Sequence, residues 1–367
     1  MKFDRLNSFL SELMEQGQIP ALSVAVGQGR ELLFSHTYGT IYESGLPANS
    51  QTLFDVASLT KIPAGICFMQ LVEEGKLRLS DPIANLFPEM AGRKPVEKDG
   101  QIIAWIDGGS VTWYQALTHT SGMGFARKKT RPSLPGLEAG LDKIFRLPFV
   151  CMPNEHVIYA DIPIILMGKA IELITNQPLD QVVYDRVCSP LSMKQTRYLR
   201  RSEGPYSVEN IAPTEYDSIF RKERVWGAVH DENAFLMDGV AGHAGIFSTA
   251  EDMCRLALAY SACFSLNGLL KQETVMHMTR QCVEEDGDRR GLIWQLSGRS
   301  DTSYTRFLSE RAYGHAGFTG CFLWSDPERD MSVVLLSNDI YQGRDHRTLF
   351  ASRPSIMRLV VEGLSSA

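Results

Sequence analysis

The stretch from Ser58 to Lys61 reads Ser-Leu-Thr-Lys and opens a long apolar segment that ends near Gly75. Apolar residues recur behind it at the spacing of one helical face: Ile62, Ile66, Met69 and Val72. This spacing predicts a buried helix over about residues 58 to 74. Residues three apart share a helical face, with Cβ atoms about 5–6 Å apart, so the amine of Lys61 reaches the hydroxyl of Ser58.

This stretch has two interpretations on local grounds. The first is a serine that caps a helix and is followed by a surface lysine. The second is a nucleophile beside a proton acceptor, because a lysine shielded from water and near other charge can have its pKa lowered enough to assist a serine. In the second case the helix amino terminus also directs N–H groups and a positive dipole end at the reaction centre.

Strand patterns lie at both ends of the chain. Ala21 to Gly27 and Glu31 to Gly39 are β-branched and aromatic runs that we expect to pair as an antiparallel hairpin. The last eighty residues return to strands at Gly291 to Leu296, Gly320 to Trp324 and Met331 to Ser337, and a closing helix follows from Arg344. The middle is mainly helical, with one clear helix at Ile162 to Thr175 and another after Ser248, where Ser-Thr-Ala-Glu has the form of a capping box.

These patterns predict an α/β (α+β) fold in which both termini build one antiparallel sheet flanked by helices, beside a mainly helical central lobe. We expect residues 1–79 and 291–367 to form the sheet-containing lobe and residues 80–290 the helical lobe. The active-site cleft is expected between the two lobes.

Composition excludes several classes of protein. The 367 residues are 44% hydrophobic and 22% charged, which is typical of a folded globular chain. Net charge is −6, so nucleic acid is an unexpected partner. No run reaches the roughly 20 apolar residues of a membrane span, and residues 1–17 mix charged and apolar residues at helical spacing. We therefore predict a cytoplasmic protein, or a periplasmic or secreted one if a leader was removed. The seven scattered cysteines form no CxxC pair and are expected to be reduced.

Two further elements favour the catalytic interpretation of Ser58. Tyr159-Ala160-Asp161 precedes an apolar helix about a hundred residues later, and His315-Ala316-Gly317 begins a carboxy-terminal strand. With these motifs in this order, the chain resembles the serine β-lactamase and penicillin-binding-protein superfamily over nearly its whole length. The resemblance is to the class C-like branch, which includes class C β-lactamases, D-stereospecific peptidases and family VIII-type carboxylesterases. Supporting segments are Leu117 to Gly122, Gly239 to Ala250 and Gly314 to Gly320.

The resemblance implies a role for each motif residue. Ser58 is the acylated nucleophile, Lys61 holds and shuttles its proton, and Tyr159 is the main acid/base partner. A tyrosine with the ordinary pKa near 10 is a poor base at neutral pH, so the pair requires a neighbouring positive charge such as Lys61. The oxyanion hole is formed by the backbone N–H groups of Ser58 and Phe318.

Asp161, His315, Ala316 and Gly317 are the expected substrate-binding residues. In relatives that bind β-lactams, the second motif usually ends in asparagine and the third begins with lysine. A histidine near pKa 6.5 is mostly neutral at pH 7, so His315 weakens a permanent cationic anchor for a substrate carboxylate. His243 also begins a His-Ala-Gly triplet, but it lies in a glycine-rich turn and we expect a structural role for it.

Other kinds of site are disfavoured. His119 near Ser121 suggests a Ser-His-Asp triad, but the chain has no G-x-S-x-G elbow. Metal-binding clusters, a P-loop and a dinucleotide fingerprint are also missing from the sequence, so we predict no metal and no cofactor. A polar cluster either flanks the cleft or is a loop scaffold: Trp226, His230, Asp231, Glu232 and Asn233.

The sequence therefore predicts a serine hydrolase that acts on a small-molecule ester, amide or peptide through an acyl-enzyme on Ser58. A penicillin-binding DD-peptidase or weak β-lactamase is the alternative. A catalytically silent binding or sensor protein and an acyltransferase with an alcohol or amine acceptor also remain open. The sequence does not decide the oligomeric state.

Overall fold

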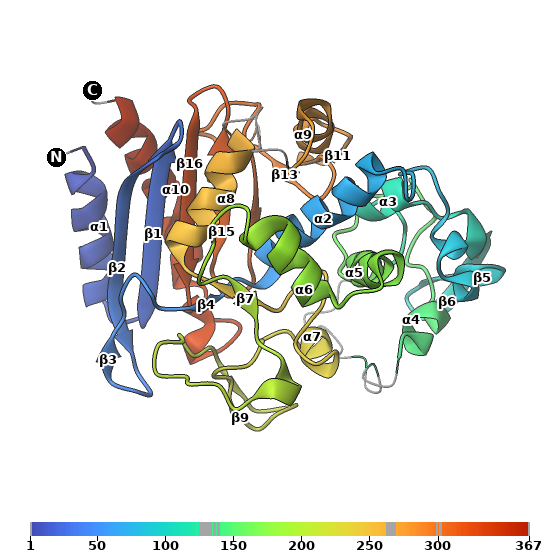
Figure 1. The fold of residues 1–367 in the computed structure, drawn as a ribbon, viewed down its shortest axis with the longest axis horizontal. Coiled ribbons are helices and arrows are strands. Elements are labelled where there is room, and N and C mark those ends of the chain that lie inside the picture. The colour runs from blue at the N-terminus through green and yellow to red at the C-terminus, as the bar shows by residue number, and fades with distance from the viewer. Residues whose placement is uncertain are drawn as a thin grey trace.

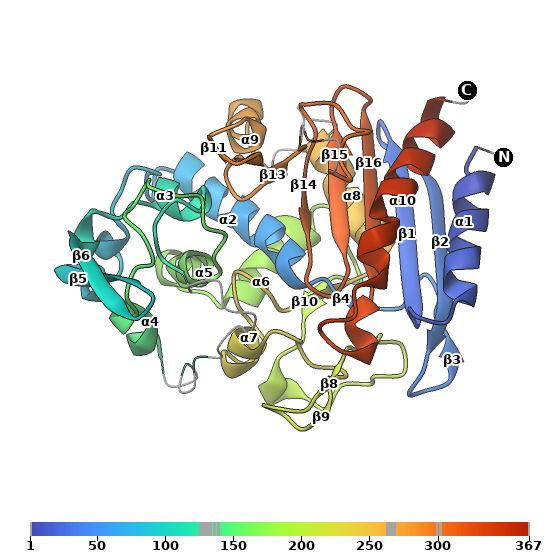
Figure 2. The ribbon, with the colours of Figure 1, turned by 180° about the vertical axis from the view of Figure 1, so that it is seen from behind.

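The computed structural model describes residues 2–124, 134, 137, 140–261, 269–298, 300 and 303–365, with the side chain of Ser261 left undescribed. Figure 1 shows a large sheet with its covering helices at one end and a group of helices with a hairpin at the other. The two chain ends lie side by side at the sheet end in both views (Figures 1 and 2). The predicted α/β fold with a sheet built from both termini is confirmed.

The main sheet joins the two ends of the chain. Its strands, in spatial order, are β11 (Val283–Glu285), β12 (Asp288–Arg290), β13 (Gln295–Leu296), β14 (Tyr313–Ala316), β15 (Phe322–Asp326), β16 (Met331–Ser337), β1 (Ala21–Gln28), β2 (Glu31–Ile41) and β3 (Leu46–Pro47). The pairings within it are antiparallel, and β1 lies directly against β16 with Val24 opposite Leu335. The predicted hairpin is thus β1 and β2.

Helices cover both faces of this sheet. The described helices are α1 (Asp4–Glu15), α2 (Lys61–Glu73), α3 (Trp113–Leu117), α4 (Asp142–Arg146), α5 (Ile162–Thr175), α6 (Leu179–Val183), α7 (Glu232–Leu236), α8 (Ala250–Ser261), α9 (Gln272–Thr279) and α10 (Thr348–Ser365). Helix α8 packs on β1, β15 and β16 in Figure 1, whereas α10 crosses in front of the sheet in Figure 2 with α1 beside it. Because both faces are covered, β16 is buried along its whole length and reads as a nearly continuous apolar run.

Successive residues of β1 pack into different cores. Val24 and Val26 join the core under α1 and α10, whereas Ala21 and Ala25 join the larger core shared with α2, α5 and α8. This follows from the period of two along a strand. The larger core continues into the helical region, where α2 packs against α5 and α6. The nucleophile helix is therefore enclosed by both parts of the molecule.

Helix α2 ends as its sequence predicts. Gly75 has φ +70, the left-handed geometry typical of the end of a helix. The N–H of Lys76 donates to the carbonyl of Leu71 at 3.0 Å, which satisfies one of the last free carbonyls of the helix. Burial is nearly complete along this helix, and it includes Lys61 at the first position.

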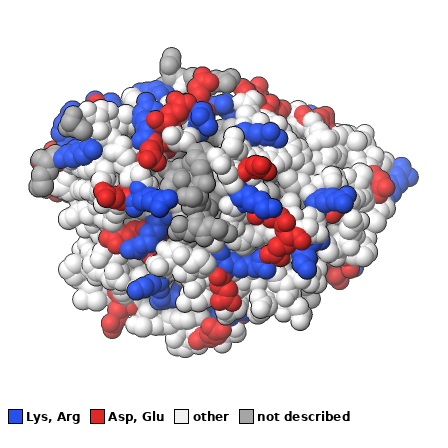
Figure 3. Space-filling view, turned by 45° about the horizontal axis from the view of Figure 1, so that its top comes forward, with Lys and Arg blue, Asp and Glu red and all other residues white. Residues whose placement is uncertain are grey.

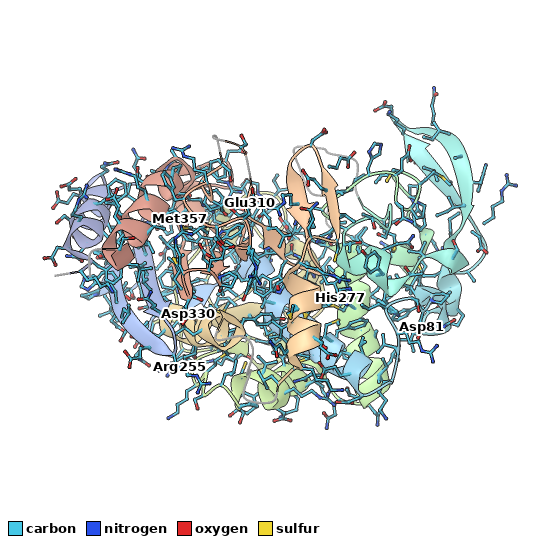
Figure 4. All side chains as sticks on the ribbon, turned by 90° about the horizontal axis from the view of Figure 1, so that it is seen from above. Asp81, Arg255, His277, Glu310, Asp330 and Met357 are labelled. Carbon is cyan, nitrogen blue, oxygen red and sulfur yellow. The ribbon has the colours of Figure 1, made fainter. Side chains whose placement is uncertain are left out.

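Smaller sheets complete the fold. Strands β4 (Phe54–Asp55), β10 (Ile246–Ser248) and β7 (Arg197–Tyr198) form one of them below the main sheet. Strands β5 (Arg93–Lys98) and β6 (Gln101–Asp107) form the outlying hairpin, and β8 (Tyr216–Asp217) pairs with β9 (Glu223–Arg224). Figure 4 shows the length of the molecule, with Met357 on α10 toward one end and Asp81 toward the other.

Two local expectations need correction. Residues 291–294 are not strand, since β13 begins only at Gln295. Ser248 does not cap α8, because it ends β10 and its Oγ bonds Thr196 Oγ1 at 2.7 Å. Thr249 provides the cap instead, and its Oγ1 accepts from the N–H of Asp252 at 3.3 Å.

The lobe boundaries at residues 79 and 291 stay a proposal, with two departures at the level of single elements. Strands β11 and β12 extend the main sheet, and α8 covers one of its faces, although all three lie within residues 80–290. Long-range strand pairing and helix packing decide these memberships, and neither is visible in a local pattern.

The cysteines, the helix lengths and the surface charges of the described residues bear on three expectations from the sequence. Among the described residues, six cysteines are free, and Cys263 lies outside the described ranges. None of the described helices is both long and apolar enough to cross a membrane. Figure 3 shows basic and acidic side chains interspersed on one face of the molecule rather than gathered by sign.

Candidate active site

Ser58 lies in a strained turn between β4 and α2. A short 3₁₀ segment, Ala57–Thr60, carries the serine directly before the helix, and the residue is only 7% exposed. Ala57 has φ +49, a left-handed conformation that costs an L-residue about 1–2 kcal/mol. The buried carboxylate of Asp55 stabilises this turn, because its Oδ1 accepts from the N–H of Ala57 at 2.8 Å. The carboxylate of Asp55 thus helps to hold Ser58 at the amino-terminal end of α2.

Lys61 is completely buried and contacts three oxygen atoms. Its Nζ lies 2.9 Å from Ser58 Oγ and 2.8 Å from Asp161 Oδ1, and it donates to the carbonyl of His243 at 3.3 Å. Burial by itself lowers the pKa of this amine, but the charges of Asp161 and Tyr159 outweigh burial and raise the pKa above its ordinary value. The expectation of a lowered lysine pKa is therefore wrong, since it left out the carboxylate of Asp161. Lys61 is a cation at neutral pH.

Tyr159 lies on the other side of this ammonium group. Its ring centroid is 5.0 Å from Lys61 Nζ, and the ring also lies 5.2 Å from the guanidinium carbon of Arg290. The hydroxyl is buried and has no hydrogen-bond partner of good geometry among the described residues, although Tyr159 is near enough to raise the pKa of Lys61. The amine therefore bonds Ser58 directly, whereas the phenol does not.

His315 is a neutral histidine in the wall of the cleft. It lies on β14, and its Nδ1 donates to the carbonyl of Ala316 at 2.9 Å, which leaves Nε2 as the acceptor nitrogen. Burial and the charges of Lys61 and Arg290 lower the pKa of His315 to about 3. The expectation that His315 supplies no permanent positive charge agrees with this pKa.

Gly317 and Phe318 bring β14 close to the nucleophile. A Cβ on Gly317 would lie 2.6 Å from the carbonyl oxygen of Val56, so a larger residue would displace the chain next to Ser58. The following residues are fixed from two sides. Thr319 Oγ1 donates to the carbonyl of Asp55 at 2.8 Å, and Arg347 Nη1 donates to the carbonyl of Phe318.

Two pockets meet at Ser58. The larger, of about 490 Å³, is lined by Tyr159, His315, Ala316 and Gly317 and by three arginines, Arg290, Arg347 and Arg353, with Asp339 as the acidic member. The smaller, of about 220 Å³, is lined by His230, Asp231, Glu232, Ala244, Arg344, Asp345 and Arg347. Ser58 and Phe318 belong to both pockets. A substrate bound at Ser58 thus has room on either side of the nucleophile.

Asp161 differs from its expected place. It was grouped with the substrate-binding residues, but its carboxylate pairs with Lys61 at 2.8 Å and it does not line either of these two pockets. Its position at the start of α5 carries it to the lysine rather than to the cleft wall. The structure therefore brings Ser58, Lys61, Tyr159 and Asp161 together, with His315 and Phe318 at the edge.

Sequence reasoning missed the arginines of the larger pocket. Arg347 directly precedes α10, Arg353 lies in its first turns, and Arg290 ends β12, so two segments far apart in the chain supply the charge. No spacing pattern links them. A signal existed only for His119, which is part of the quoted segment Leu117 to Gly122 and proves to be buried against Tyr159 with ring centroids 4.7 Å apart.

The polar cluster after the long loop divides between both expectations. His230, Asp231 and Glu232 line the smaller pocket, where the ring of His230 stacks on Phe318 at 5.3 Å. Trp226 and Asn233 instead support loops. Nε1 of Trp226 donates to the carbonyl of Ile211 at 2.7 Å, and Oδ1 of Asn233 accepts from the N–H of Leu134 at 2.9 Å. The first and last residues of the cluster therefore stabilise loops, and the three residues between them line the smaller pocket.

Neither a triad nor a metal centre is found in the described part of the chain. His119 Nδ1 accepts from the N–H of Ala160 at 3.3 Å, and Ser121 Oγ accepts from the N–H of Met123 at 3.2 Å, so the two side chains are engaged elsewhere. Within the described ranges, no group of three or more His, Cys, Asp or Glu side chains is placed to hold a metal ion.

Comparisons with known proteins agree with this geometry. The chain is 29% identical over 374 residues to a putative D-alanyl-D-alanine carboxypeptidase of Escherichia coli (strain K12), a match that covers 92% of this chain and 82% of the relative. Among solved structures, EstCE1, a hydrolase with promiscuous acyltransferase activity, has a TM-score of 0.75 at 19% identity and covers 98% of this chain and 97% of its own. A class C beta-lactamase has a TM-score of 0.73 at 19% identity and covers 100% of this chain and 96% of its own.

The structural likenesses concern the fold, because their sequence identities are low. The family is decided by a sequence model. The beta-lactamase family model matches residues 6–354, which is nearly the whole chain, and it includes each of the three motifs around Ser58. This chain, a serine hydrolase, therefore belongs to the beta-lactamase family.

Proposed function

We propose that the protein cleaves an ester or amide through an acyl-enzyme on Ser58. The observation that carries this proposal is the buried ammonium group of Lys61, which lies 2.9 Å from Ser58 Oγ and 2.8 Å from Asp161 Oδ1 beside the ring of Tyr159. A cation fixed in this way favours negative charge on a neighbouring oxygen. The site is therefore suited to removing the proton of Ser58.

In the first half of the reaction, the phenolate of Tyr159, which the charge of Lys61 stabilises, accepts the hydroxyl proton of Ser58. The Oγ–carbonyl carbon bond forms, and the backbone N–H groups of Ser58 and Phe318 donate to the oxyanion. Such donors contribute roughly 2.7–4 kcal/mol each. The bond to the leaving group then breaks, and Tyr159 returns the proton to that group.

In the second half, water takes the place of the leaving group. Tyr159 accepts a proton from water, the hydroxide oxygen attacks the acyl carbon, and Ser58 leaves with the proton restored to its Oγ. Transfer to an alcohol or amine follows the same steps with a different acceptor. Product analysis with an added alcohol distinguishes the two outcomes.

A second candidate is a carboxypeptidase of the D-alanyl-D-alanine type, and the charge of the larger pocket favours it. Arg290 and Arg353 each have an Nε atom without a hydrogen-bond partner in the described part of the chain, and Arg347 lies between the two pockets. These guanidinium groups replace the positive charge that neutral His315 does not supply. A substrate with a terminal carboxylate next to the scissile bond would suit this wall.

Intact-protein mass spectrometry tests the proposal. The protein is exposed to a fluorophosphonate, a p-nitrophenyl ester and a penicillin, with Ser58→Ala as the control. We expect adducts from the first two that disappear in the variant, and little from penicillin. Labelling that persists in Ser58→Ala excludes this serine as the nucleophile.

Two peptides separate the candidates. One ends in a free D-Ala-D-Ala carboxylate and the other carries the same sequence as a carboxamide. Preferential cleavage of the free acid, weakened about tenfold or more in Arg290→Gln, supports the carboxypeptidase. Equal cleavage of both peptides, or cleavage of esters alone, supports the first candidate. The cytoplasmic location expected from the sequence stays a prediction, which cell fractionation tests.

A further inference from the structure

The segment that carries Tyr159 has no regular secondary structure of its own. Residues 152–160 form turns and irregular backbone between α4 and α5, so internal helix or sheet hydrogen bonds do not fix the phenol. Its position must come from contacts with other elements. His119, two residues after α3, contacts the backbone on both sides of Tyr159 as well as its ring.

His119 holds the backbone on both sides of Tyr159. Its carbonyl oxygen accepts from the N–H of Ile158 at 2.8 Å, and its Nδ1 accepts from the N–H of Ala160 at 3.3 Å. The residue is 1% exposed, and its ring packs on the ring of Tyr159 with centroids 4.7 Å apart at 49°. One residue thus fixes the preceding amide, the following amide and one face of the phenol ring.

The backbone of His119 is adapted to this task. It has φ +60, the left-handed region that side-chain-bearing residues rarely adopt. This conformation ends the turn after α3 and directs both the carbonyl and the ring at residues 158–160. Strained backbone of this kind persists where surrounding contacts hold it, and it often lies at functional sites.

The geometry and burial of the imidazole favour its neutral form. Because a backbone N–H donates to Nδ1, the ring proton resides on Nε2. Burial, followed by the charges of Arg290 and Lys61, lowers the pKa of His119 well below its ordinary value. Both Nε2 and the hydroxyl of Tyr159 are buried without a hydrogen-bond partner among the described residues, in a cluster that also includes Lys61 and His315.

We propose that His119 is the positioning residue of Tyr159, holding the phenol beside Lys61 and Ser58 through the paired contacts to Ile158 and Ala160. This inference rests on the proposed acid/base role of Tyr159. It assigns a function to the segment Leu117 to Gly122 beyond ending a helix. A misplacement of a catalytic group by about 1 Å can cost about a hundredfold in rate, so the effect belongs in kcat.

The test compares two substitutions at this position. His119→Phe keeps an aromatic face against Tyr159 but removes the Nδ1 acceptor, whereas His119→Asn keeps a side-chain acceptor and tolerates the left-handed backbone. Active sites are counted by fluorophosphonate titration, so that unfolded protein does not lower the rate. We expect kcat per site to fall about a hundredfold in His119→Phe with KM changed less than about threefold, and to recover to within about tenfold of wild type in His119→Asn.

A double-mutant cycle with Tyr159→Phe separates positioning from a general loss of structure. If His119 acts through the phenol, His119→Phe lowers kcat by less than about threefold in the Tyr159→Phe background. The matched control is His277→Phe on α9, a residue that lines neither of the two pockets at Ser58, so removing its imidazole should leave kcat per site unchanged.

The outcomes distinguish this inference from the proposed function. Wild-type kcat in Tyr159→Phe overturns the role of the phenol and the inference with it. A strong loss in Tyr159→Phe together with wild-type kcat in His119→Phe overturns the inference alone. An undiminished effect of His119→Phe in the Tyr159→Phe background, or equal losses in the Phe and Asn variants, also overturns it.

Discussion

The two His-Ala-Gly triplets of this chain have the same sequence and use different parts of the first residue. His315 lies within β14, and its side chain forms part of the wall of the larger pocket, where burial and nearby cations lower its pKa to about 3. His243 lies in a turn before β10, its ring pairs with Asp231 at 2.8 Å, and its backbone carbonyl accepts from Lys61 at 3.3 Å. One triplet thus contributes a side chain to the site, and the other contributes a main-chain oxygen.

The difference shows that the flanking structure decides what a short motif does. His315 lies on β14, which places its side chain in the wall of the larger pocket, whereas His243 lies in a turn that a short strand and a capped helix follow. The sequence-based choice of His315 as the third motif agrees with this placement. The structural role expected for His243 is only part of its contribution, because its carbonyl touches the lysine that bonds Ser58.

The glycines of the two triplets provide the sharpest way to break this comparison. In Gly317→Ala, the new Cβ meets the carbonyl of Val56 at 2.6 Å, two residues before Ser58, so we expect kcat per titrated site to fall about a hundredfold. In Gly245→Ala, the Cβ meets the carbonyl of Gly239 at 2.2 Å in a backbone with φ +123, so we expect a loss of stability, seen as a lower Tm, with kcat per site retained.

Steady-state rates and thermal melts of both variants check this prediction. If Gly245→Ala loses kcat per site as strongly as Gly317→Ala, the two triplets act alike and the comparison fails. Ser58→Ala provides the background rate.

The next largest difference is expected between substitutions of two aspartates, Asp161, which pairs with Lys61, and Asp231, which pairs with the ring of His243. Asp161 raises the pKa of Lys61, so Asp161→Asn lowers that pKa and moves the alkaline limb of kcat/KM to lower pH. We expect kcat/KM at neutral pH to fall about tenfold or more, because the ammonium group loses its charged partner. Asp231→Asn keeps an oxygen for the ring of His243 and for the N–H of Ala234, so its profile should stay close to wild type.

Rates measured from pH 5 to pH 11 decide this point. An unmoved or raised alkaline limb in Asp161→Asn would contradict the cationic role of Lys61. A shift of equal size in Asp231→Asn would instead show that the lysine responds to the whole His243 region.

The motifs and long elements of the fold were predictable from the sequence, and the charge of the site was not. The spacing behind Ser58 predicted the buried helix, and the order of the motifs at Ser58, Tyr159 and His315 predicted the family and the class of enzyme. The pairing of Asp161 with Lys61 joins residues a hundred positions apart, so no local pattern reported it. That pairing reverses the direction of the lysine pKa shift.

Positions set by tertiary contacts were beyond local patterns for the same reason. Arg347 and Arg353 reach the cleft only because α10 crosses the sheet beside β16, as Figure 2 shows. The helix cap lies one residue later than the sequence pattern predicts. Ser248 pairs with Phe54 of β4, and the preceding Phe247 pairs with Arg197 of β7, so Ser248 belongs to the strand. Strand pairing outweighed a helix signal there.

Acid stability is the next smaller effect, and it concerns the side chain of His315. An unfolded histidine binds a proton below about pH 6.5, whereas the folded group with a pKa of about 3 does not. Between these values the unfolded state holds more protons, so stability falls as the pH falls, and above about pH 6.5 the effect vanishes. His315→Asn removes this term and should lose up to about 3 kcal/mol less than wild type between pH 7 and pH 4.5.

Urea unfolding of both proteins at pH 7 and pH 4.5 measures this difference, with the values at pH 7 as the internal reference. An equal loss of stability in wild type and His315→Asn would mean that the folded histidine takes up a proton, and would contradict a neutral side chain in the pocket wall.

The smallest effect is expected at the start of α8, just after the triplet that begins at His243. Thr249 Oγ1 accepts from the N–H of Asp252 at 3.3 Å at the start of α8, so Thr249→Ala should lower the free energy of unfolding by about 1 kcal/mol. Thr249→Ser keeps the hydroxyl and is the matched control. Packing on the sheet holds α8 in place without the cap, and the carbonyl that Lys61 contacts belongs to His243, six residues before Thr249. We therefore expect kcat/KM to stay at the wild-type value. A change in kcat/KM per titrated site would show that the capped helix transmits its position to the carbonyl of His243, and the turn would then be part of the catalytic machinery rather than its support.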